Sequence, residues 1–243
     1  MRKRERECNR IFQVWSCGGG VDSAAMAVLI CQGRLPKPDY AIMTDNGYDS
    51  SYTWDYVDQV LKPKLAEIGV DLVIIKSKEY VDTNIVKGGT VVIPAYSKKD
   101  GKAVRFGTKC SGTWKLTPAK RWLRERGVER CINWIGIAAD EPNRIRQSRL
   151  KWISFKYPLY EYNLSRRDCK RLIKEAGWPV PLRSSCVMCP QRTDNQWLDL
   201  RDDYPGDYQR AVDIEMGMHE TNPDVFLHRS LKRLDHADFR GGG

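Results

Sequence analysis

The sequence IFQVWSCGGGVDSAAMAVLI, residues 11–30, decides the fold of this chain. Its first part, Ile11–Trp15, has the apolar clustering of a short buried strand. Three consecutive glycines follow, and the apolar run after Ser23 predicts a helix. Glycines between a strand and a helix let backbone N–H groups approach a ligand, and the helix adds the positive end of its dipole. The stretch therefore predicts a phosphate-binding turn.

The spacing of the glycines narrows the kind of phosphate loop. No Lys follows them as a Walker loop requires, and the dinucleotide pattern GxGxxG is absent. The turn resembles the SGGxDS pyrophosphate loop of the adenine nucleotide α-hydrolase superfamily, whose members cleave ATP between its α and β phosphates. The residues that this resemblance places at the nucleotide are Ser16, Gly18, Gly19, Gly20, Asp22 and Ser23. Gly18 stands where the motif has its first Ser, and an ordinary glycine-rich turn is the alternative interpretation.

The composition favours a polyanionic partner. Lys and Arg number 41 against 31 Asp and Glu in 243 residues, which gives a formal net charge of +10. Eight Trp and eleven Tyr offer surfaces on which bases can stack. A nucleic acid is therefore the expected partner, and the alternative is a basic protein whose charges only keep it dissolved.

The ends of the chain and its apolar runs bear on location. The first ten residues, MRKRERECNR, are charged and precede no apolar signal segment, and the final glycines, Gly241–Gly243, are expected to be unstructured. The longest apolar run, Ala24–Cys31, is too short to span a bilayer. We expect a cytoplasmic protein with no membrane partner. Its eight cysteines would then be reduced, which favours metal or redox chemistry over a disulfide scaffold.

Alternating strand and helix patterns indicate an α/β fold. After the first strand and helix, strands are expected at 39–44, 71–75, 131–139 and 157–160, and helices at 50–68, 117–126 and 165–177, the last with a capping box at Ser165 and Asp168. Repeats of this length imply right-handed crossovers, and therefore an open parallel sheet flanked by helices.

Two regions depart from this alternation. Residues 76–108 combine glycines, prolines and lysines with little periodicity, which is typical of a lid or a mobile loop. From residue 179 the composition shifts to prolines and cysteines, with short helices expected near 192–201 and 207–216. The expected division is a nucleotide-binding domain over 1–164 and a small helical, cysteine-containing region over 165–243.

Polar residues follow three of the expected strands. In an open parallel sheet the carboxyl ends of the strands form the ligand-binding edge, so residues 45–47 and 140–144 should join the glycine turn there. Asp22 is suited to hold Mg²⁺ or to orient the phosphates. Arg144 and Lys115 are expected to neutralise charge on the departing pyrophosphate. For Asp45, a turn or cap role is an equally good interpretation.

Three cysteines suggest a metal centre. Cys186 and Cys189 form a CxxCP element, and Cys110 lies in a polar TKCSG segment. Two thiolates three residues apart can bind one metal, and a third can complete a cluster face. A [4Fe–4S] cluster with one open iron and a zinc site with a fourth ligand such as His228 both fit this set. The alternative is a pair of core cysteines.

Several blocks together resemble the phosphoadenosine phosphosulfate reductase-like family, in its phage and bacterial branch. Besides the glycine turn these are residues 44–48, Cys110 with Lys115 and Pro118, 134–137 with Asp140, Glu141 and Arg144, 157–159, 184–190 with Trp197, and 227–230. The resemblance covers most of residues 11–230. It implies a five-stranded parallel sheet that binds Mg-ATP, with Asp45, Gly136 and Asp140 also at the nucleotide.

The likeness to a sulfate-donor reductase stops at the catalytic thiol. Those enzymes use a cysteine near the carboxyl terminus in an ECGxH-type segment, and no Cys follows Cys189 here. A chain without that thiol cannot form a thiosulfonate intermediate. Relatives that combine a pyrophosphate loop with three cysteines instead activate and sulfurate nucleic acid, as tRNA thiolation enzymes and the ATPase component of DNA phosphorothioation do.

The leading functional hypothesis is therefore an ATP pyrophosphatase that adenylates an acceptor, either tRNA or DNA, for sulfur transfer through a three-cysteine iron–sulfur cluster. A sulfur donor protein would be a further partner. The alternatives are a reductase of sulfated adenylyl nucleotides, a zinc-stabilised nucleic-acid-binding module and an amide-forming ligase that uses ammonia.

Overall fold

The computed structural model describes residues 10–107 and 110–239. Its contacts divide the chain into two compact units, which are described separately. Unit 1 comprises Met1–Asp45, Tyr52–Lys76 and Thr117–Ser184, and unit 2 comprises Asn46–Ser51, Ser77–Leu116 and Ser185–Gly243. The boundary expected near residue 164 lies inside unit 1, because the chain leaves this unit and returns to it after two of its strands. The expectations for the charged amino-terminal segment and for the final glycines concern residues outside the described ranges.

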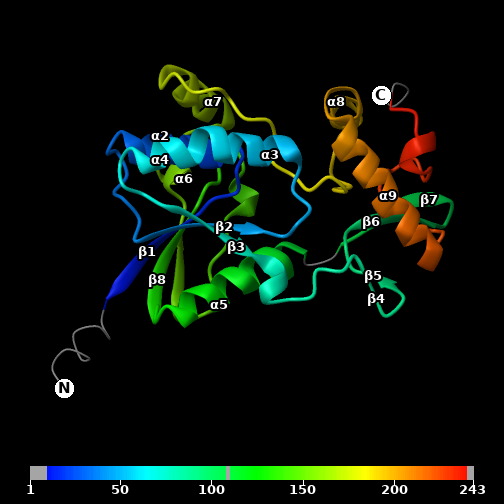
Figure 1. Ribbon diagram of the computed structural model, residues 1–243, viewed down its shortest axis with the longest axis horizontal. Coiled ribbons are helices and arrows are strands. Elements are labelled where there is room, and N and C mark those ends of the chain that lie inside the picture. Colours follow the sequence, from blue (N-terminus) through cyan, green and yellow to red (C-terminus); the bar gives the residue numbers. More distant parts are fainter. Residues whose placement is uncertain (1–9, 108–109, 240–243) are drawn as a thin grey trace. The chain divides into compact units, whose positions relative to one another are not determined.

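Unit 1 is built on one parallel sheet with strand order β3-β2-β1-β8-β9 (Figure 1). Its strands are β1 (Ile11–Ser16), β2 (Tyr40–Asp45), β3 (Leu72–Lys76), β8 (Arg130–Ile135) and β9 (Ile153–Lys156). β1 lies at the centre, with Trp15 opposite Ala41 of β2 and Trp134 of β8. The order reverses direction at β1, so the turn that follows it is at the topological switch point. The α/β fold with an open five-stranded parallel sheet is confirmed.

Helices cover both faces of this sheet. They are α2 (Val21–Cys31), α3 (Ser51–Tyr56), η1 (Val57–Leu61), α4 (Lys62–Ala66), α5 (Thr117–Glu125), η4 (Pro142–Arg144), α6 (Pro158–Glu161) and α7 (Arg166–Glu175). Figure 1 shows α2, α4 and α7 over one face and α5 on the other. Ten of the eleven α2 residues are buried, and α2 packs most extensively against α7. The capping box at Ser165 and Asp168 is present at the start of α7.

The fifth strand is not where the sequence pattern put it. Residues 157–160 were expected as a strand, but Pro158 begins α6 and the strand is the preceding ISFK segment, β9. Proline is favoured at the first helical position because its missing N–H would have no partner there. The Tyr157 hydroxyl donates to the Arg146 carbonyl at 2.7 Å and accepts from the Arg146 N–H at 3.0 Å, so it anchors the chain before β9.

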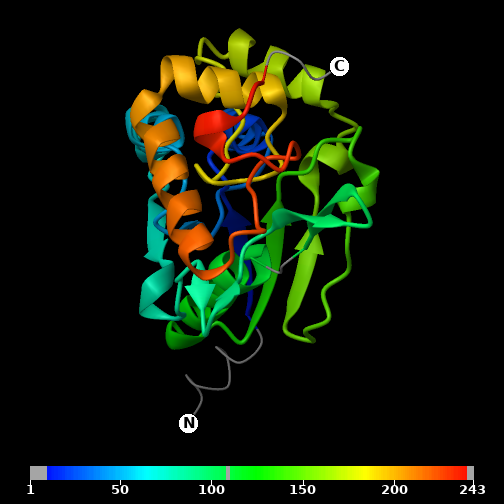
Figure 2. The same cartoon turned by 90° about the vertical axis from the view of Figure 1, so that its right-hand side faces the viewer.

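Unit 2 contains two short hairpins and two helices. Its elements are η2 (Ser77–Glu79), β4 (Val86–Lys87), β5 (Thr90–Val91), β6 (Ala95–Lys99), β7 (Lys102–Phe106), η3 (Ser111–Leu116), α8 (Asp194–Asp203), α9 (Pro205–Thr221) and η5 (Leu234–His236). In Figure 2 the long helix α9 (orange) follows directly from α8. The buried Glu215 side chain of α9 accepts the backbone N–H groups of Leu227 at 2.7 Å and Leu234 at 2.6 Å. This carboxylate therefore fixes the carboxyl-terminal segment to α9.

The expectation of an irregular lid over residues 76–108 is wrong for its described part. Two antiparallel pairs form there, β4 with β5 and β6 with β7. Their turns are Gly88–Gly89 and Asp100–Gly101, with φ of 54° and 75° in the first and 50° and 77° in the second. Gly-Gly and Asp-Gly pairs with positive φ are the preferred two-residue hairpin turns. Within the described residues, no helix has the length and apolar character needed to cross a membrane.

Candidate functional site

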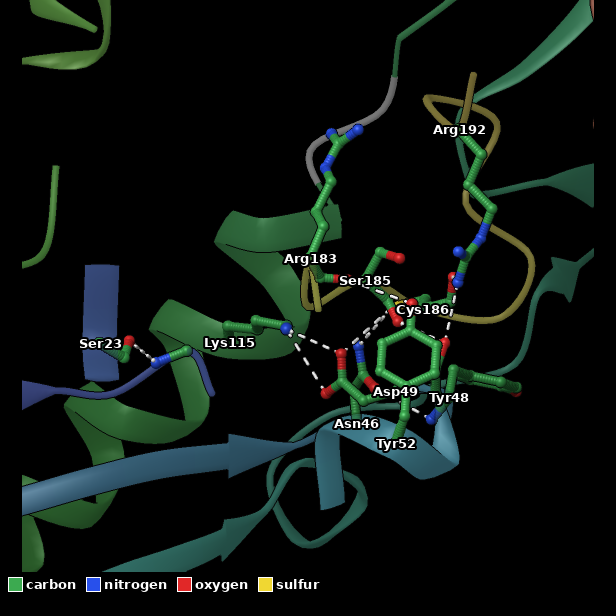
Figure 3. Close-up of polar contacts among 12 residues, drawn as sticks. Ser23, Asn46, Tyr48, Asp49, Tyr52, Lys115, Arg183, Ser185, Cys186 and Arg192 are labelled. Carbon is green, nitrogen blue, oxygen red and sulfur yellow. Dashed lines mark hydrogen bonds and ion pairs between the residues drawn. The ribbon is translucent and has the colours of Figure 1, made fainter. Parts of the chain in front are cut away.

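The glycine turn of unit 1 joins β1 to α2. The Gly18 N–H donates to the Ser23 hydroxyl at 2.7 Å, so a first-turn side chain of α2 holds the loop closed (Figure 3). Gly20 is the N-cap of α2, its backbone is extended, and no side chain caps the helix. The first N–H groups of a helix have no intrahelical partner and attract anions. The turn therefore has the helix N-terminus without a side-chain cap that an anion-binding turn needs, and anion binding here stays a prediction.

A Cβ would make close contacts at three positions near this turn. A Cβ on Gly19 would lie 2.7 Å from the Thr53 methyl group, and its φ of +70° also disfavours other residues. A Cβ on Gly20 would lie 2.7 Å from the Ser184 hydroxyl, and one on Gly136 would lie 3.2 Å from the Asp22 backbone. The glycines thus bring the loop close to α3 and bring the end of β8 against the first turn of α2.

Asp22 is the buried carboxylate of this site. It is 8% exposed, and its Oδ1 accepts a charged hydrogen bond from Arg166 Nη1 at 3.1 Å. Burial raises the pKa of Asp22 above its ordinary 3.8; Arg166 and Arg144 lower it, whereas Glu141 and Asp140 raise it. Charges of both signs therefore act on the pKa of Asp22, and burial has the largest effect on it.

The segment after β8 supplies the charged groups around Asp22. Arg144 Nη1 pairs with Glu141 Oε2 at 2.6 Å. Asp140 Oδ1 accepts the backbone N–H of Arg166 at 2.9 Å, and Arg166 Nη2 lies 4.0 Å from Glu141. Charges from η4 and from the start of α7 thus meet beside the first turn of α2. Sequence reasoning placed Asp140 and Arg144 here but did not assign Arg166 a role.

Two further predicted residues end neighbouring strands of unit 1. The Ser16 hydroxyl donates to Asn133 Oδ1 at 2.9 Å, which links β1 to β8 just before the turn. Asp45 is the last residue of β2, opposite Lys76 of β3. Both residues lie at the carboxyl edge of the sheet, where the glycine turn also lies. Unit 1 therefore brings together every predicted residue of the nucleotide site that it contains.

In unit 2, Cys186 and Lys115 converge on Asp49 (Figure 3). Lys115 Nζ lies 3.2 Å from Asp49 Oδ1 and 3.5 Å from Oδ2, and the Asp49 carboxylate is almost fully buried. The Cys186 thiol donates to Asp49 Oδ1 at 3.7 Å and accepts from Asn46 Nδ2 at 3.3 Å. The result is a compact network of a cation, a carboxylate and a thiol.

Backbone and arginine contacts hold this network in place. Asp49 and Cys186 form an antiparallel bridge. On either side of it, the Val187 N–H donates to the Tyr48 carbonyl at 2.8 Å and the Ser50 N–H to the Ser185 carbonyl at 3.1 Å. The buried Arg192 side chain donates to the Ser50 hydroxyl at 2.8 Å and to the Cys186 carbonyl at 3.2 Å. Sequence reasoning missed Asp49 and Arg192, because no local pattern marks the contacts of Asp49 with Cys186 and of Arg192 with Ser50, which each join residues more than 130 positions apart.

The network shifts the pKa values of two of its members. Burial and then the nearby Asp49 raise the pKa of the Cys186 thiol, Lys115 and the Asn46 hydrogen bond lower it, and the net result is a pKa of about 12. Burial lowers the pKa of Lys115, but Asp49 and Cys186 outweigh this, so that it is raised overall. At neutral pH Cys186 is therefore a protonated thiol beside the Lys115 ammonium group.

The predicted metal ligands do not form a metal site in this arrangement. Cys110, Cys186 and Cys189 all belong to unit 2 and are free thiols. Among the residues that the structure describes, no group of three or more His, Cys, Asp or Glu side chains could hold a metal ion. Cys186 is committed to Asn46 and Asp49 instead. The donor set as arranged fits neither a [4Fe–4S] cluster nor zinc, and no chemical step below depends on one.

Comparison with known proteins identifies the fold. No family model and no curated protein matches the sequence. Among solved structures, the U34-tRNA thiolase NcsA from Methanococcus maripaludis, with its [4Fe–4S] cluster, has a TM-score of 0.50 and 17% identity over 98% of this chain and 79% of that chain. The phosphoadenylyl-sulfate (PAPS) reductase from Candida auris, in its phosphate complex, has a TM-score of 0.43 and 16% identity over 74% and 79%.

The likeness at a TM-score of 0.50 shows that the chain has the fold of NcsA, the adenine nucleotide α-hydrolase fold that the sequence resemblance implies. The glycine turn lies at the switch point after β1, where open α/β sheets bind ligands.

Proposed function

We propose that this protein is a PP-loop ATP pyrophosphatase that uses Mg-ATP to adenylate an acceptor, a nucleic acid, for sulfur transfer. The observation that carries the proposal is the turn after β1. It combines a helix N-terminus without a side-chain cap, a loop closed by the Ser23 hydroxyl, and two glycines, Gly19 and Gly20, at which a Cβ would lie 2.7 Å from a neighbouring side chain. A loop of this kind accommodates phosphate oxygens at backbone distance.

In the proposed reaction an acceptor oxygen attacks the α-phosphorus of ATP. The bond from that phosphorus to the oxygen bridging the α and β phosphates breaks, and pyrophosphate leaves with the bonding electron pair. The N–H groups at the start of α2 hold the departing phosphates, and Arg144 stabilises their growing negative charge. A sulfide-level donor then displaces AMP, which carries away the acceptor oxygen, so the exchange involves no net oxidation.

Mg²⁺ fits this site through Asp22. Magnesium is usually held by one or two carboxylates together with substrate phosphates, so a single buried carboxylate beside the loop is a sufficient protein contribution. When bound, the ion would supply charge neutralisation on the phosphates. Arg166 orients the Asp22 carboxylate through its 3.1 Å contact. The proposal keeps the roles expected from the sequence: Lys115 neutralises charge on the departing pyrophosphate, and Asp45 and Gly136 lie at the nucleotide.

Two findings support a nucleic acid as acceptor. The chain has a net charge of +10, and the solved structure that it resembles at a TM-score of 0.50 is by its printed name a tRNA thiolase. The three-cysteine cluster expected from the sequence is not part of this proposal, because Cys186 is hydrogen-bonded to Asn46 and Asp49 and the described residues do not gather a metal-binding set.

The experiment measures AMP and pyrophosphate release from Mg-ATP with tRNA, with DNA and without acceptor. We expect acceptor-dependent release that is lost in Asp22→Asn and reduced in Arg144→Ala. Lys115→Met, assayed beside them, tests whether that cation also contributes. Absence of both products with every acceptor would contradict the proposal, and sulfite release from a sulfated adenylyl nucleotide with thioredoxin would replace it with the reductase.

A further inference from the structure

The connection between β8 and β9 is unusually basic. The stretch from Pro142 through β9 to Tyr160 contains no acidic residue, and the nearest carboxylates in the sequence are Glu141 before it and Glu161 after it. The cations between them are Arg144, Arg146, Arg149, Lys151 and Lys156. Arg146, Arg149 and Lys151 are exposed. Arg144 pairs with Glu141 and Lys156 lies 3.6 Å from Glu161, so the run of exposed cations outside these two pairs is Arg146, Arg149 and Lys151. Such a run of one sign is an electrostatic footprint for a polyanion.

The sheet topology of unit 1 determines the path that this connection follows. β8 and β9 are parallel neighbours, with Cys131 opposite Ile153 and Trp134 opposite Lys156. The chain must therefore return from the carboxyl edge of the sheet, where Asp22 lies, to the amino edge, where β9 begins. The six-residue β8 makes this path roughly 20 Å long. In Figure 2 the yellow-green chain descends beside the edge strand before it turns back into it.

An open pocket of about 460 Å³ lies at the far end of this path. Its lining is Thr117, Lys120, Arg121, Arg124 and Glu125 of α5 with Leu150 and Trp152 of the connection. α5 buries Trp122 and Leu123 and places the Trp122 ring edge-on to Tyr40 of β2 at 5.3 Å. Its cations therefore face the pocket. Arg124 lies over the Trp152 ring, 3.9 Å from its centroid.

We propose that these two regions form one RNA-binding surface, the basic track, made of Arg146, Arg149 and Lys151 of the connection and Lys120, Arg121 and Arg124 of α5. Its cations bind successive phosphates, and the pocket formed by Leu150 and Trp152 takes an unpaired base. An indole flanked by a guanidinium and an apolar side chain is a stacking surface that needs a base outside a duplex. Single-stranded RNA, as in a loop, supplies such bases.

The track begins two residues after Arg144, which is among the charges that act on Asp22, so it lies next to the proposed nucleotide site. That the bound RNA is the acceptor rests on the proposed function. RNA binding itself does not depend on adenylation, so the two can fail separately.

The test is fluorescence anisotropy with a labelled RNA stem-loop across a salt series. The triple variant Lys120→Glu, Arg149→Glu, Lys151→Glu should bind at least about tenfold more weakly, and the slope of log K against log[salt] should fall by about 2. The matched control reverses Lys37, Lys170 and Lys174, three exposed lysines elsewhere on unit 1. Both variants lower the formal charge from +10 to +4, since each reversal subtracts two. Equal loss in both would overturn the track.

Two more measurements test the unpaired-base pocket and the independence of RNA binding from ATP chemistry. Trp152→Leu keeps apolar volume but removes the stacking ring, so we expect about tenfold weaker RNA binding and unchanged binding of a blunt DNA duplex. Equal affinity of wild-type protein for the duplex and the stem-loop, or tighter binding to anionic vesicles, would overturn the unpaired-base part. ATP binding should stay unchanged in the triple variant. If Asp22→Asn abolishes ATP turnover while RNA affinity persists, the proposed chemistry and the track are tested independently.

Discussion

At Asp22 the requirements of folding stability and of the proposed ATP chemistry oppose each other. Burial raises its pKa, so the native state holds the proton more tightly than the unfolded chain, in which the pKa is about 3.8. The stability that this proton contributes is fully present below the unfolded value and is lost as pH rises through the raised native value. Ionised Asp22 therefore costs folding free energy at neutral pH.

We predict that Asp22→Asn lowers ATP turnover by at least about a hundredfold while leaving the melting temperature at neutral pH unchanged or higher. Arg166, which is a third exposed, can be solvated after losing its partner. Unfolding measured from about pH 4 to about pH 7 should show a smaller loss of stability in the variant than in the wild type. A large drop in melting temperature would instead make Asp22 a structural residue.

Gly19 gives a second prediction at this scale. Gly19→Ala should cost about 1–3 kcal/mol of folding stability and abolish nucleotide binding, because of its positive φ and the 2.7 Å approach to the Thr53 methyl group. The control is Gly217→Ala in the interior of α9, where nothing lies within 4 Å of the new Cβ. That change should stabilise the protein by about 0.5–1 kcal/mol. Urea unfolding and ATP titration check both variants, and normal ATP binding by Gly19→Ala would refute the loop geometry.

The individual site residues differ in how predictable they were. Gly19, Asp22 and Ser23 follow from a local motif, because the turn and the helix start are encoded within a few residues. Arg166 binds Asp22 from 144 residues away, and no local pattern marks it. Only its position just after the Ser165 cap, at a helix start, could have drawn attention to it.

At the level of elements, apolar periodicity predicted the positions of the buried strands, whereas turn-forming residues determine where the remaining elements lie. β1, β2, β3 and β8 are apolar runs between glycines and charges, so their positions were predictable. The two hairpins of unit 2 were missed although Asp100–Gly101 carries their strongest signal, because strands as short as β4 and β5 have no measurable alternation. Two of the four residues of the edge strand β9 are exposed, which weakens its apolar pattern.

The segment around Cys186 allows a decisive test of the metal prediction. If three thiolates hold an open [4Fe–4S] cluster, anaerobically purified protein should be brown, with about four iron and about four sulfide per chain. Cys186→Ser should lose this content and Cys31→Ser, on the α2 helix, should keep it. Colourless protein free of iron and zinc would contradict the prediction and leave Cys186 as the hydrogen-bonded thiol that the structure describes.

At the scale of the whole molecule, neither unit is a continuous piece of chain. The path passes from one unit to the other five times, after Asp45, Ser51, Lys76, Leu116 and Ser184. A single linear boundary does not describe this division, because two segments of unit 2 follow β2 and β3 of unit 1 and the chain then returns to unit 1. Interleaving of this kind couples the folding of both units, since unfolding either one releases the ends of the other's segments.

We therefore predict one calorimetric unfolding transition, and a shift of that whole transition by ligand. Mg-ATP at a hundred times its dissociation constant contributes about 2.7 kcal/mol to the native state, which for a chain of this length raises the melting temperature by roughly 5–11 °C. Asp22→Asn should melt as one transition too but show little of the shift. Two transitions, only one of them moved by Mg-ATP, would show that the units unfold independently in spite of their interleaving. No shift at saturating Mg-ATP would contradict nucleotide binding at the turn after β1, and with it the proposed chemistry.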